Sequence, residues 1–179
     1  MNKKVLILSG SPRRGGNSDL LCDAFMKGAL EAGNEVKKIF VRDQKIAPCN
    51  ACGYCMAHGG VCVLQDDMAD ILEKMHWADV IVLSSPVYFY SVAAQMKMVI
   101  DRTFTQWTQL KDKELYYIMT AAEDTATVMD GTLACFRGFS ASLEGAVEKG
   151  VLYGKGVYDV GDVKGTSYMQ EAYEMGKNV

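Results

Sequence analysis

Four of the six cysteines follow one another closely in the stretch PCNACGYCMAHGGVC. They are Cys49, Cys52, Cys55 and Cys62, in a C-x2-C-x2-C-x6-C pattern. Three thiolates spaced by two residues can surround one face of an iron–sulfur cubane, and the glycines between them allow tight turns. The spacing predicts a [4Fe–4S] cluster with these four thiolates as its ligands.

Two other states of these thiols stay open. Four thiolates also bind structural zinc, although such sites usually combine two separated C-x2-C pairs, and this run does not contain two. Alternatively the thiols carry no metal and are sensitive to oxidation, because they are close together in a glycine-rich segment. Disulfides would be expected in a secreted chain with six cysteines, but not in a reducing compartment.

A second stretch, LILSGSPRRGGNSDLL at residues 6–21, passes from an apolar run through a glycine-rich loop into a helical pattern. Glycines let the backbone approach a ligand closely, and Asn17 or Ser18 can cap the helix. A helix N-terminus favours an anion, and the guanidinium of Arg13 suits a phosphate. The stretch predicts a phosphate-binding loop, and the alternative is a capped turn with solvated arginines.

The composition of this loop narrows the kind of phosphate. It lacks the Gly-Lys-Ser/Thr sequence of an ATP or GTP loop, and its glycines do not fit the G-x-G-x-x-G pattern of a dinucleotide site. It contains no thiol nucleophile, and the hydroxyls of Ser9 and Ser11 have no basic partner nearby in sequence. Nucleoside triphosphates, dinucleotides and phosphatase chemistry are therefore disfavoured.

A third stretch, SSPVYFYSVAAQMKMVIDR at residues 84–102, places a proline and three aromatic residues between a strand and a helix. Taken alone, these aromatic residues fit a hydrophobic core as well as a ligand wall. Their position at the end of a strand favours the wall. Asp101 and Arg102, at the end of the helix, are expected to be solvated.

These stretches must be positioned by alternating strands and helices. The expected strands are Lys3–Ser9, Glu35–Val41, Ala78–Ser85, Glu114–Ala121 and Gly150–Gly154. The expected helices are a first one with Leu20 to Leu30 on its apolar stripe, then Met68–Trp77, Val92–Phe104, Met129–Val147 and Ser167–Gly176. This alternation predicts a single α/β domain over residues 1–179, with a flavodoxin-like, doubly wound, five-stranded parallel sheet of order 2-1-3-4-5. Ligands of such sheets bind beyond the carboxyl ends of the strands, where the second and third stretches meet.

Composition and charge exclude several other classes of function. The chain has 179 residues and a formal net charge of −3 with scattered positive residues, so we expect no nucleic-acid partner. Its first apolar run, Val5–Leu8, is too short for a signal peptide or a membrane span. We therefore expect a cytoplasmic protein that does not bind membranes.

In combination, GSPRRGGNS and SPVYFYSVAAQMKMVIDR resemble the flavodoxin-like NAD(P)H-dependent FMN reductase family, and the cysteine run is similar to that of its iron–sulfur flavoprotein branch. The resemblance extends from the first strand to the C-terminal helix. It implies an FMN site formed by the following residues: Ser9, Ser11, Arg13, Asn17 and Ser18 at the phosphate; Pro86, Val87, Tyr88, Phe89, Tyr90 and Ser91 along the ribityl chain and ring; and Thr120, Ala121, Ala122 and Glu123 at the other edge of the ring. The last group departs from the family, which commonly has a glycine there.

The resemblance also implies the reaction. Hydride would pass from NAD(P)H to the flavin, and electrons would continue to a flavin, a quinone or another acceptor, or singly through the cluster. No side chain is required as a general acid or base. The alternatives are an iron–sulfur electron carrier and a flavin-binding protein without turnover. The helix after Phe89, rich in methionine and aromatic residues, is a candidate face for a homodimer or a higher homo-oligomer.

Overall fold

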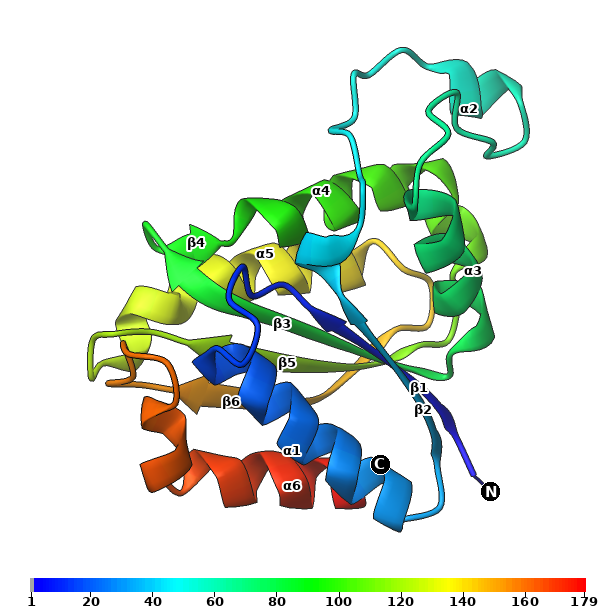
Figure 1. Ribbon diagram of the computed structural model, residues 1–179. Coiled ribbons are helices and arrows are strands. Elements are labelled where there is room, and N and C mark those ends of the chain that lie inside the picture. The colour runs from blue at the N-terminus through cyan, green and yellow to red at the C-terminus, as the bar shows by residue number, and fades with distance from the viewer. Residues whose placement is uncertain (1) are drawn as a thin grey trace.

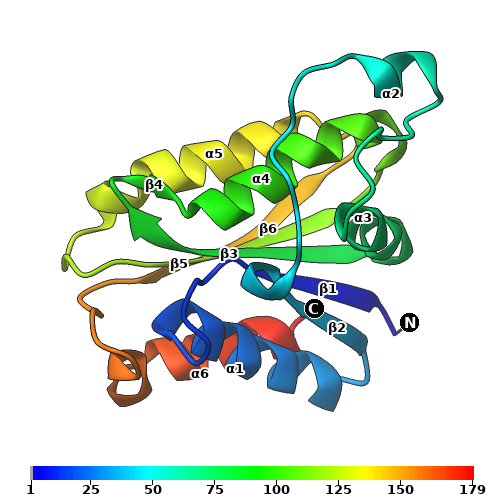
Figure 2. The same cartoon turned by 45° about the horizontal axis from the view of Figure 1, so that its top comes forward.

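The computed structural model describes residues 2–179. A parallel sheet in the order β2-β1-β3-β5-β6 lies between two layers of helices (Figures 1 and 2). Its five long strands are β1 (Lys4–Ser9), β2 (Glu35–Phe40), β3 (Val80–Tyr88), β5 (Glu114–Thr120) and β6 (Val147–Gly154). In chain order these are the first to fifth long strands, so the predicted flavodoxin-like order 2-1-3-4-5 is confirmed.

Helices cover both faces of the sheet, as Figure 2 shows, and each group packs on its own half of the core. The first pair is α1 (Asn17–Glu31) and α6 (Tyr168–Lys177), and the second group is α3 (Met68–Trp77), α4 (Ala94–Arg102) and α5 (Asp130–Ala141). The first pair approaches closely at two glycines. A Cβ atom on Gly28 would lie 2.0 Å from the carbonyl oxygen of Tyr173, and one on Gly176 would lie 2.0 Å from that of Phe25.

The core has two halves, one on each face of the sheet. Along β1, Leu6 and Leu8 pack towards α3 and α4, whereas Val5 and Ile7 pack towards α1, and all four are fully buried. Strands covered on both faces become continuous apolar runs. This is why the central strands were predictable from the sequence.

Three predicted boundaries are wrong. The third predicted strand ended at Ser85, but β3 continues to Tyr88 and forms an antiparallel hairpin with the short strand β4 (Ser91–Val92). The helix predicted over Met129–Val147 ends at Ala141, and β6 begins at Val147 rather than Gly150. The first residues of β6 are exposed at the edge of the sheet, so they lack the apolar signal of a buried strand.

Most of the remaining helical elements are short 3-10 helices. The 3-10 helices are η1 (Val41–Asp43), η2 (Thr103–Thr105), η3 (Trp107–Gln109), η4 (Ala126–Met129) and η5 (Asp162–Gly165). None of the helices that the structure describes is long and apolar enough to cross a membrane.

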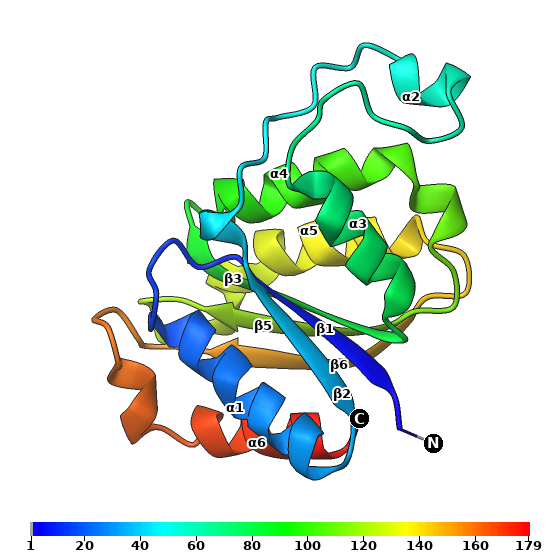
Figure 3. The same cartoon turned by 45° about the vertical axis from the view of Figure 1, so that its right-hand side comes forward.

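The chain between η1 and α3, residues 44–67, is called the cysteine segment here. It contains the one-turn helix α2 (Tyr54–Ala57) and projects beyond α3 and α4, away from the sheet (Figure 3). The two ends of the cysteine segment are joined by hydrogen bonds. The N–H of Lys45 donates to the Asp67 carboxylate at 2.7 Å, and the N–H of Asp67 donates back to the Lys45 carbonyl at 3.1 Å.

Candidate functional site

The three groups of residues predicted to bind the flavin lie at the carboxyl ends of β1, β3 and β5. These strands are parallel, so their carboxyl ends lie on the same side of the sheet. The loop after β1 is tied to β3, since the N–H of Gly10 donates to the carbonyl of Ser84 at 2.8 Å. The loop after β5 is tied to β6, since the N–H of Ala121 donates to the carbonyl of Gly154 at 2.9 Å. The structure thus brings the predicted groups to the same side of the molecule.

The loop after β1, residues 10–16, requires glycine at its start. A Cβ atom on Gly10 would lie 2.6 Å from the Ser84 carbonyl oxygen, closer than atoms can approach. Ser11 stabilises the turn that follows: its hydroxyl accepts from the N–H of Arg13 at 3.1 Å and donates to the carbonyl of the same residue at 2.9 Å. Gly15 has a positive φ of 68°. The loop is therefore defined by its own backbone before any ligand binds.

The N-terminus of α1 has hydrogen-bond donors that are available to an anion. Gly16 is its N-cap, and no side chain caps it, so the expectation that Asn17 or Ser18 caps the helix is wrong. The first N–H groups of a helix have no partner within it. The hydroxyl of Ser18 is buried and has no hydrogen-bond partner in the part of the chain that the structure describes. A phosphate fits this position, because it would accept from the hydroxyl and the helix N–H groups.

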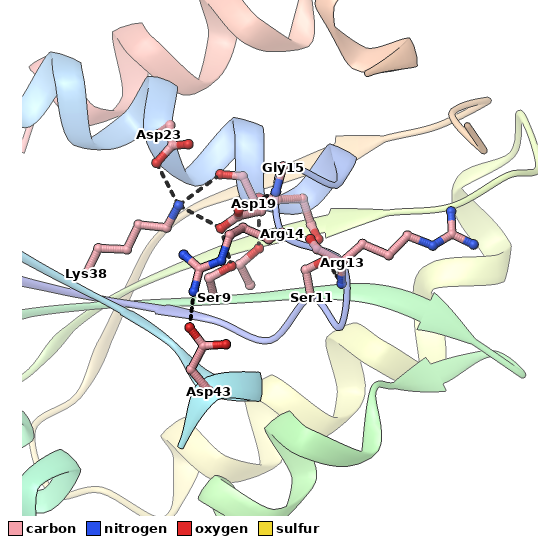
Figure 4. A network of polar contacts seen from close by, with 11 residues as sticks. Ser9, Ser11, Arg13, Arg14, Gly15, Asp19, Asp23, Lys38 and Asp43 are labelled. Carbon is pink, nitrogen blue, oxygen red and sulfur yellow. Dashed lines mark hydrogen bonds and ion pairs between the residues drawn. The ribbon is translucent and has the colours of Figure 1, made fainter. Parts of the chain in front are cut away.

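Asn17 connects the loop after β1 to the loop after β6 instead. Its amide nitrogen donates to the carbonyl of Asp159 at 2.9 Å, and its amide oxygen accepts from the N–H of Gly161 at 3.1 Å. Arg13 contacts the same loop, since its Nη1 donates to the carbonyl of Tyr158 at 3.3 Å. Its side chain is exposed and extends away from Ser9 and Asp19 (Figure 4).

Ser9 lies below the loop. It is fully buried, and its hydroxyl donates to the carboxylate of Asp19 at 2.7 Å. Asp19 also accepts from the N–H of Gly15 and pairs with Lys38 (Figure 4). Burial alone would raise the pKa of Asp19, but these hydrogen bonds hold it below its usual value. Ser9 therefore shapes the loop from underneath, and its hydroxyl already has a partner.

The aromatic residues after β3 form the tip of a hairpin rather than part of the core. Phe89 and Tyr90 are its two turn residues, with positive φ values of 48° and 62°. Such a two-residue turn normally contains Asn and Gly, because other side chains are strained there. Phe89 is fully exposed, Tyr90 is 66% exposed and Tyr88 42%. Strain and exposed aromatic area together favour a ligand wall over core packing.

The other predicted ring contacts differ in exposure. Pro86 and Val87 are half-buried, and Ser91 is exposed. After β5, Thr120 and Ala121 are buried, whereas Ala122 and Glu123 are exposed. The backbone there is fixed by the loop after β6, because the carbonyl of Glu123 accepts from the N–H of Gly156 at 3.0 Å.

The four cysteines of the cysteine segment line one cavity of about 1020 Å³. Its other walls come from the end of α4, from η2 and η3 with Phe104 and Trp107, and from α5 with Phe139. Cys49 and Cys52 are exposed, Cys55 and Cys62 are partly buried, and none forms a disulfide. The donor set suits an iron–sulfur cluster, because it consists of four thiols. Within residues 2–179, however, no three His, Cys, Asp or Glu side chains are arranged to hold a metal ion.

Sequence reasoning missed the residue that fixes this segment. Arg102 was expected to be solvated, but its side chain is 2% exposed. Its Nη1 donates to the carbonyl of Ala47 at 2.7 Å, and its Nη2 lies 3.5 Å from the sulfur of Cys62. A signal was present, because Arg102 continues the three-residue spacing of the buried residues Met96 and Val99 on α4.

Comparison with known proteins identifies relatives of this chain. The family model described as NADPH-dependent FMN reductase matches residues 3–134. An iron–sulfur flavoprotein of Methanosarcina thermophila is 41% identical over 100 residues, which are 56% of this chain and 52% of that protein. One from Methanocaldococcus jannaschii is 44% identical over 100 residues, 56% of this chain and 51% of that protein. The matched part thus spans about half the length of these relatives.

Solved structures show the same fold at low sequence identity. An azoreductase from Bacillus anthracis superposes with a TM-score of 0.79 at 15% identity, and the match covers 100% of both chains. At this identity the likeness concerns the architecture of the sheet and its helices.

Proposed function

Because the chain belongs to the NADPH-dependent FMN reductase family, we propose that it is an FMN-dependent oxidoreductase that takes hydride from NAD(P)H and passes electrons to a flavin, a quinone or another acceptor. NAD(P)H is a substrate in this proposal rather than a resident cofactor. The iron–sulfur flavoproteins that it matches support the flavin by name.

One observation carries the proposal. The buried hydroxyl of Ser18 has no partner, and it lies at the uncapped start of α1, on the edge of the sheet where the strained aromatic hairpin also ends. An anion at α1 and a flat aromatic group against the hairpin would use both features. FMN combines a phosphate and a flat ring in one molecule.

Bound FMN would supply the redox chemistry, accepting a hydride and releasing its electrons to the acceptor. The chain itself has three tasks. Ser18, the N–H groups of α1 and Arg13 would hold the phosphate. Tyr88 to Tyr90 would support the ring, and the backbone of Ala121 to Glu123 would position its other edge. No side chain of the site needs to gain or lose a proton.

Anaerobic stopped-flow mixing tests the activity. The protein reconstituted with FMN is mixed with NADPH and, separately, with NADH, and the flavin absorbance is followed. The proposal expects at least one of them to bleach the flavin, and an added quinone to restore the absorbance. Absence of bleaching by either nucleotide at millimolar concentration would leave a flavin-binding protein without turnover.

A second function, single-electron transfer, is supported by the four cysteines that line one cavity. We propose that Cys49, Cys52, Cys55 and Cys62 bind a [4Fe–4S] cluster, as the names of the relatives suggest. A cluster would exchange single electrons with the flavin or with an external carrier. Gathering the four thiols requires the cysteine segment to close, and the positive φ angles at Ala51, Gly53, Gly59 and Gly60 mark where its backbone turns.

Iron and sulfide analysis of protein purified without oxygen tests the cluster. About four of each per chain are expected, with loss of both in Cys52→Ser. Cys135→Ser is the matched control, because Cys135 lines the same cavity but lies outside the run. Zinc in place of iron would indicate a structural site, and absence of metal would leave redox-sensitive thiols. The homodimer and the cytoplasmic location expected from the sequence stay predictions.

A further inference from the structure

We propose that Lys38 is a positioning residue for the phosphate of FMN, because it neutralises a buried carboxylate under the phosphate loop. The proposal rests on the FMN binding proposed above. It assigns a role to a side chain of β2, which sequence reasoning treated only as part of a strand.

The carboxylate in question belongs to Asp19, in the first turn of α1. Its side chain is 6% exposed, and it accepts from the hydroxyl of Ser9 at 2.7 Å and from the N–H of Gly15 at 2.9 Å (Figure 4). These bonds join the end of β1, the loop and the helix. The shape of the phosphate loop therefore depends on this carboxylate.

The same carboxylate creates an electrostatic problem for the ligand. The N-terminus of a helix attracts an anion through a partial positive charge of about half a unit, which a nearby carboxylate offsets. A phosphate monoester carries close to two negative charges at neutral pH. Without compensation, Asp19 would repel the group that the loop is shaped to receive.

Lys38 supplies that compensation from the neighbouring strand. Its Nζ lies 2.6 Å from the carboxylate of Asp19 and 2.6 Å from that of Asp23, one turn further along α1. It also donates to the carbonyl of Asp19 at 3.3 Å. The lysine side chain is 16% exposed, so solvent screens these contacts less than those of a surface pair.

The pair is ionised despite its burial. Burial alone would lower the pKa of Lys38 and raise that of Asp19, but the hydrogen bonds between them reverse both shifts. The other cations near the loop are more exposed: Arg14 pairs with Asp43 at the surface, and Arg13 extends away from Asp19. Of these three cations, Lys38 is thus the least exposed, and it contacts the loop carboxylate directly.

Flavin titrations of the apo-protein separate this role from general stabilisation, because riboflavin has the ring of FMN but no phosphate. In Lys38→Met, FMN affinity should fall by about tenfold or more, since repulsion of the phosphate is restored. Riboflavin affinity should change less than about twofold in the same variant, because the ring is uncharged. Equal losses for both flavins would contradict the proposal.

A double variant gives the sharper readout. Asp19→Asn combined with Lys38→Met removes the repelling charge together with its partner, so most of the lost FMN affinity should return. Lys38→Arg should stay near wild type, because it keeps the charge. If the double variant binds FMN no better than Lys38→Met, Lys38 only supports the structure and the proposal is wrong.

A control and a replacement variant complete the design. Lys37→Met changes the adjacent residue of β2, whose Nζ lies 3.9 Å from the centre of the Trp77 ring, and should leave both affinities unchanged. Should Lys38→Met fail to fold by circular dichroism, Lys38→Gln replaces it, because its amide can still donate to Asp19 without a charge. Wild-type protein that binds neither flavin would overturn the proposed function itself, whereas unchanged discrimination in a folded Lys38 variant would overturn this inference alone.

Discussion

The guanidinium of Arg102, at the end of α4, donates two hydrogen bonds to the carboxylate of Asp66, at 2.6 and 3.0 Å. Asp66 also accepts from the N–H of Ala47 at 3.0 Å, so one ion pair joins α4 to both ends of the cysteine segment. The segment has a single turn of helix of its own. Its base is therefore held by this buried pair, while the stretch that carries the cysteines projects from it.

Removing one partner of this pair should be strongly destabilising. Arg102→Met leaves the Asp66 carboxylate partly buried and unpaired, which costs about 3–5 kcal/mol of unfolding free energy. Urea unfolding measures this loss. Lys97→Gln is the control, because Lys97 and Asp101 form an exposed pair on the same helix, worth about 0.5 kcal/mol or less. Similar losses in both variants would contradict a special role of Arg102.

The paired carboxylates also predict how stability depends on pH. The pKa values of Asp66 and Asp19 are lowered in the folded protein by hydrogen bonds from Arg102 and Lys38, which outweigh burial. The contribution of these two carboxylates to the free energy of unfolding is complete above the unfolded pKa of about 3.9. It is lost as the pH falls through the lower pKa values of the folded protein. The midpoint of urea unfolding should therefore decrease below about pH 4. In Asp66→Asn the decrease should be smaller, and an unchanged profile would show that other groups cause it.

Most of the fold was predictable because its strands are buried on both faces and become apolar runs. The hairpin after β3 was not predictable, because Phe89 and Tyr90 occupy turn positions that are usually recognised in a sequence by Asn or Gly. The contacts of Arg102 with Asp66 and of Lys38 with Asp19 join residues distant in the sequence, and charge alone does not distinguish them from solvated side chains. Residue types predicted a phosphate-binding loop after β1, but they did not indicate which of its hydroxyls lack a hydrogen-bond partner.

The close approach of the loop after β1 to β3 predicts the effect of a single methyl group. Gly10→Ala should lower stability by about 1–3 kcal/mol, because the new Cβ would collide with the Ser84 carbonyl and displace the loop. FMN affinity should fall with it. Gly138→Ala is the matched control: Gly138 lies within α5 with open space around it, and alanine there should raise stability by about 0.5–1 kcal/mol. Intact FMN binding in Gly10→Ala would contradict the loop assignment.

The strained hairpin predicts a trade between stability and function. Replacing Phe89 and Tyr90 by Asn and Gly relieves two left-handed non-glycine residues and should raise stability by about 1–3 kcal/mol. FMN affinity should decrease in the same variant, because the aromatic wall is removed. Thermal unfolding and flavin titration measure the two effects. A variant that is stabilised and still binds FMN normally would show that the hairpin does not contact the ring.

The central claim is that the phosphate of FMN lies at the start of α1, near Ser18, and phosphorus NMR of the bound cofactor tests it directly. The second ionisation of a free phosphate monoester has a pKa of about 6. Hydrogen bonds from the helix N–H groups, from Ser18 and from Arg13 favour the dianion and should lower that pKa. We predict a ³¹P signal that is shifted from that of free FMN and does not titrate between about pH 5.5 and 8. A bound FMN whose phosphate titrates like the free cofactor would contradict the account.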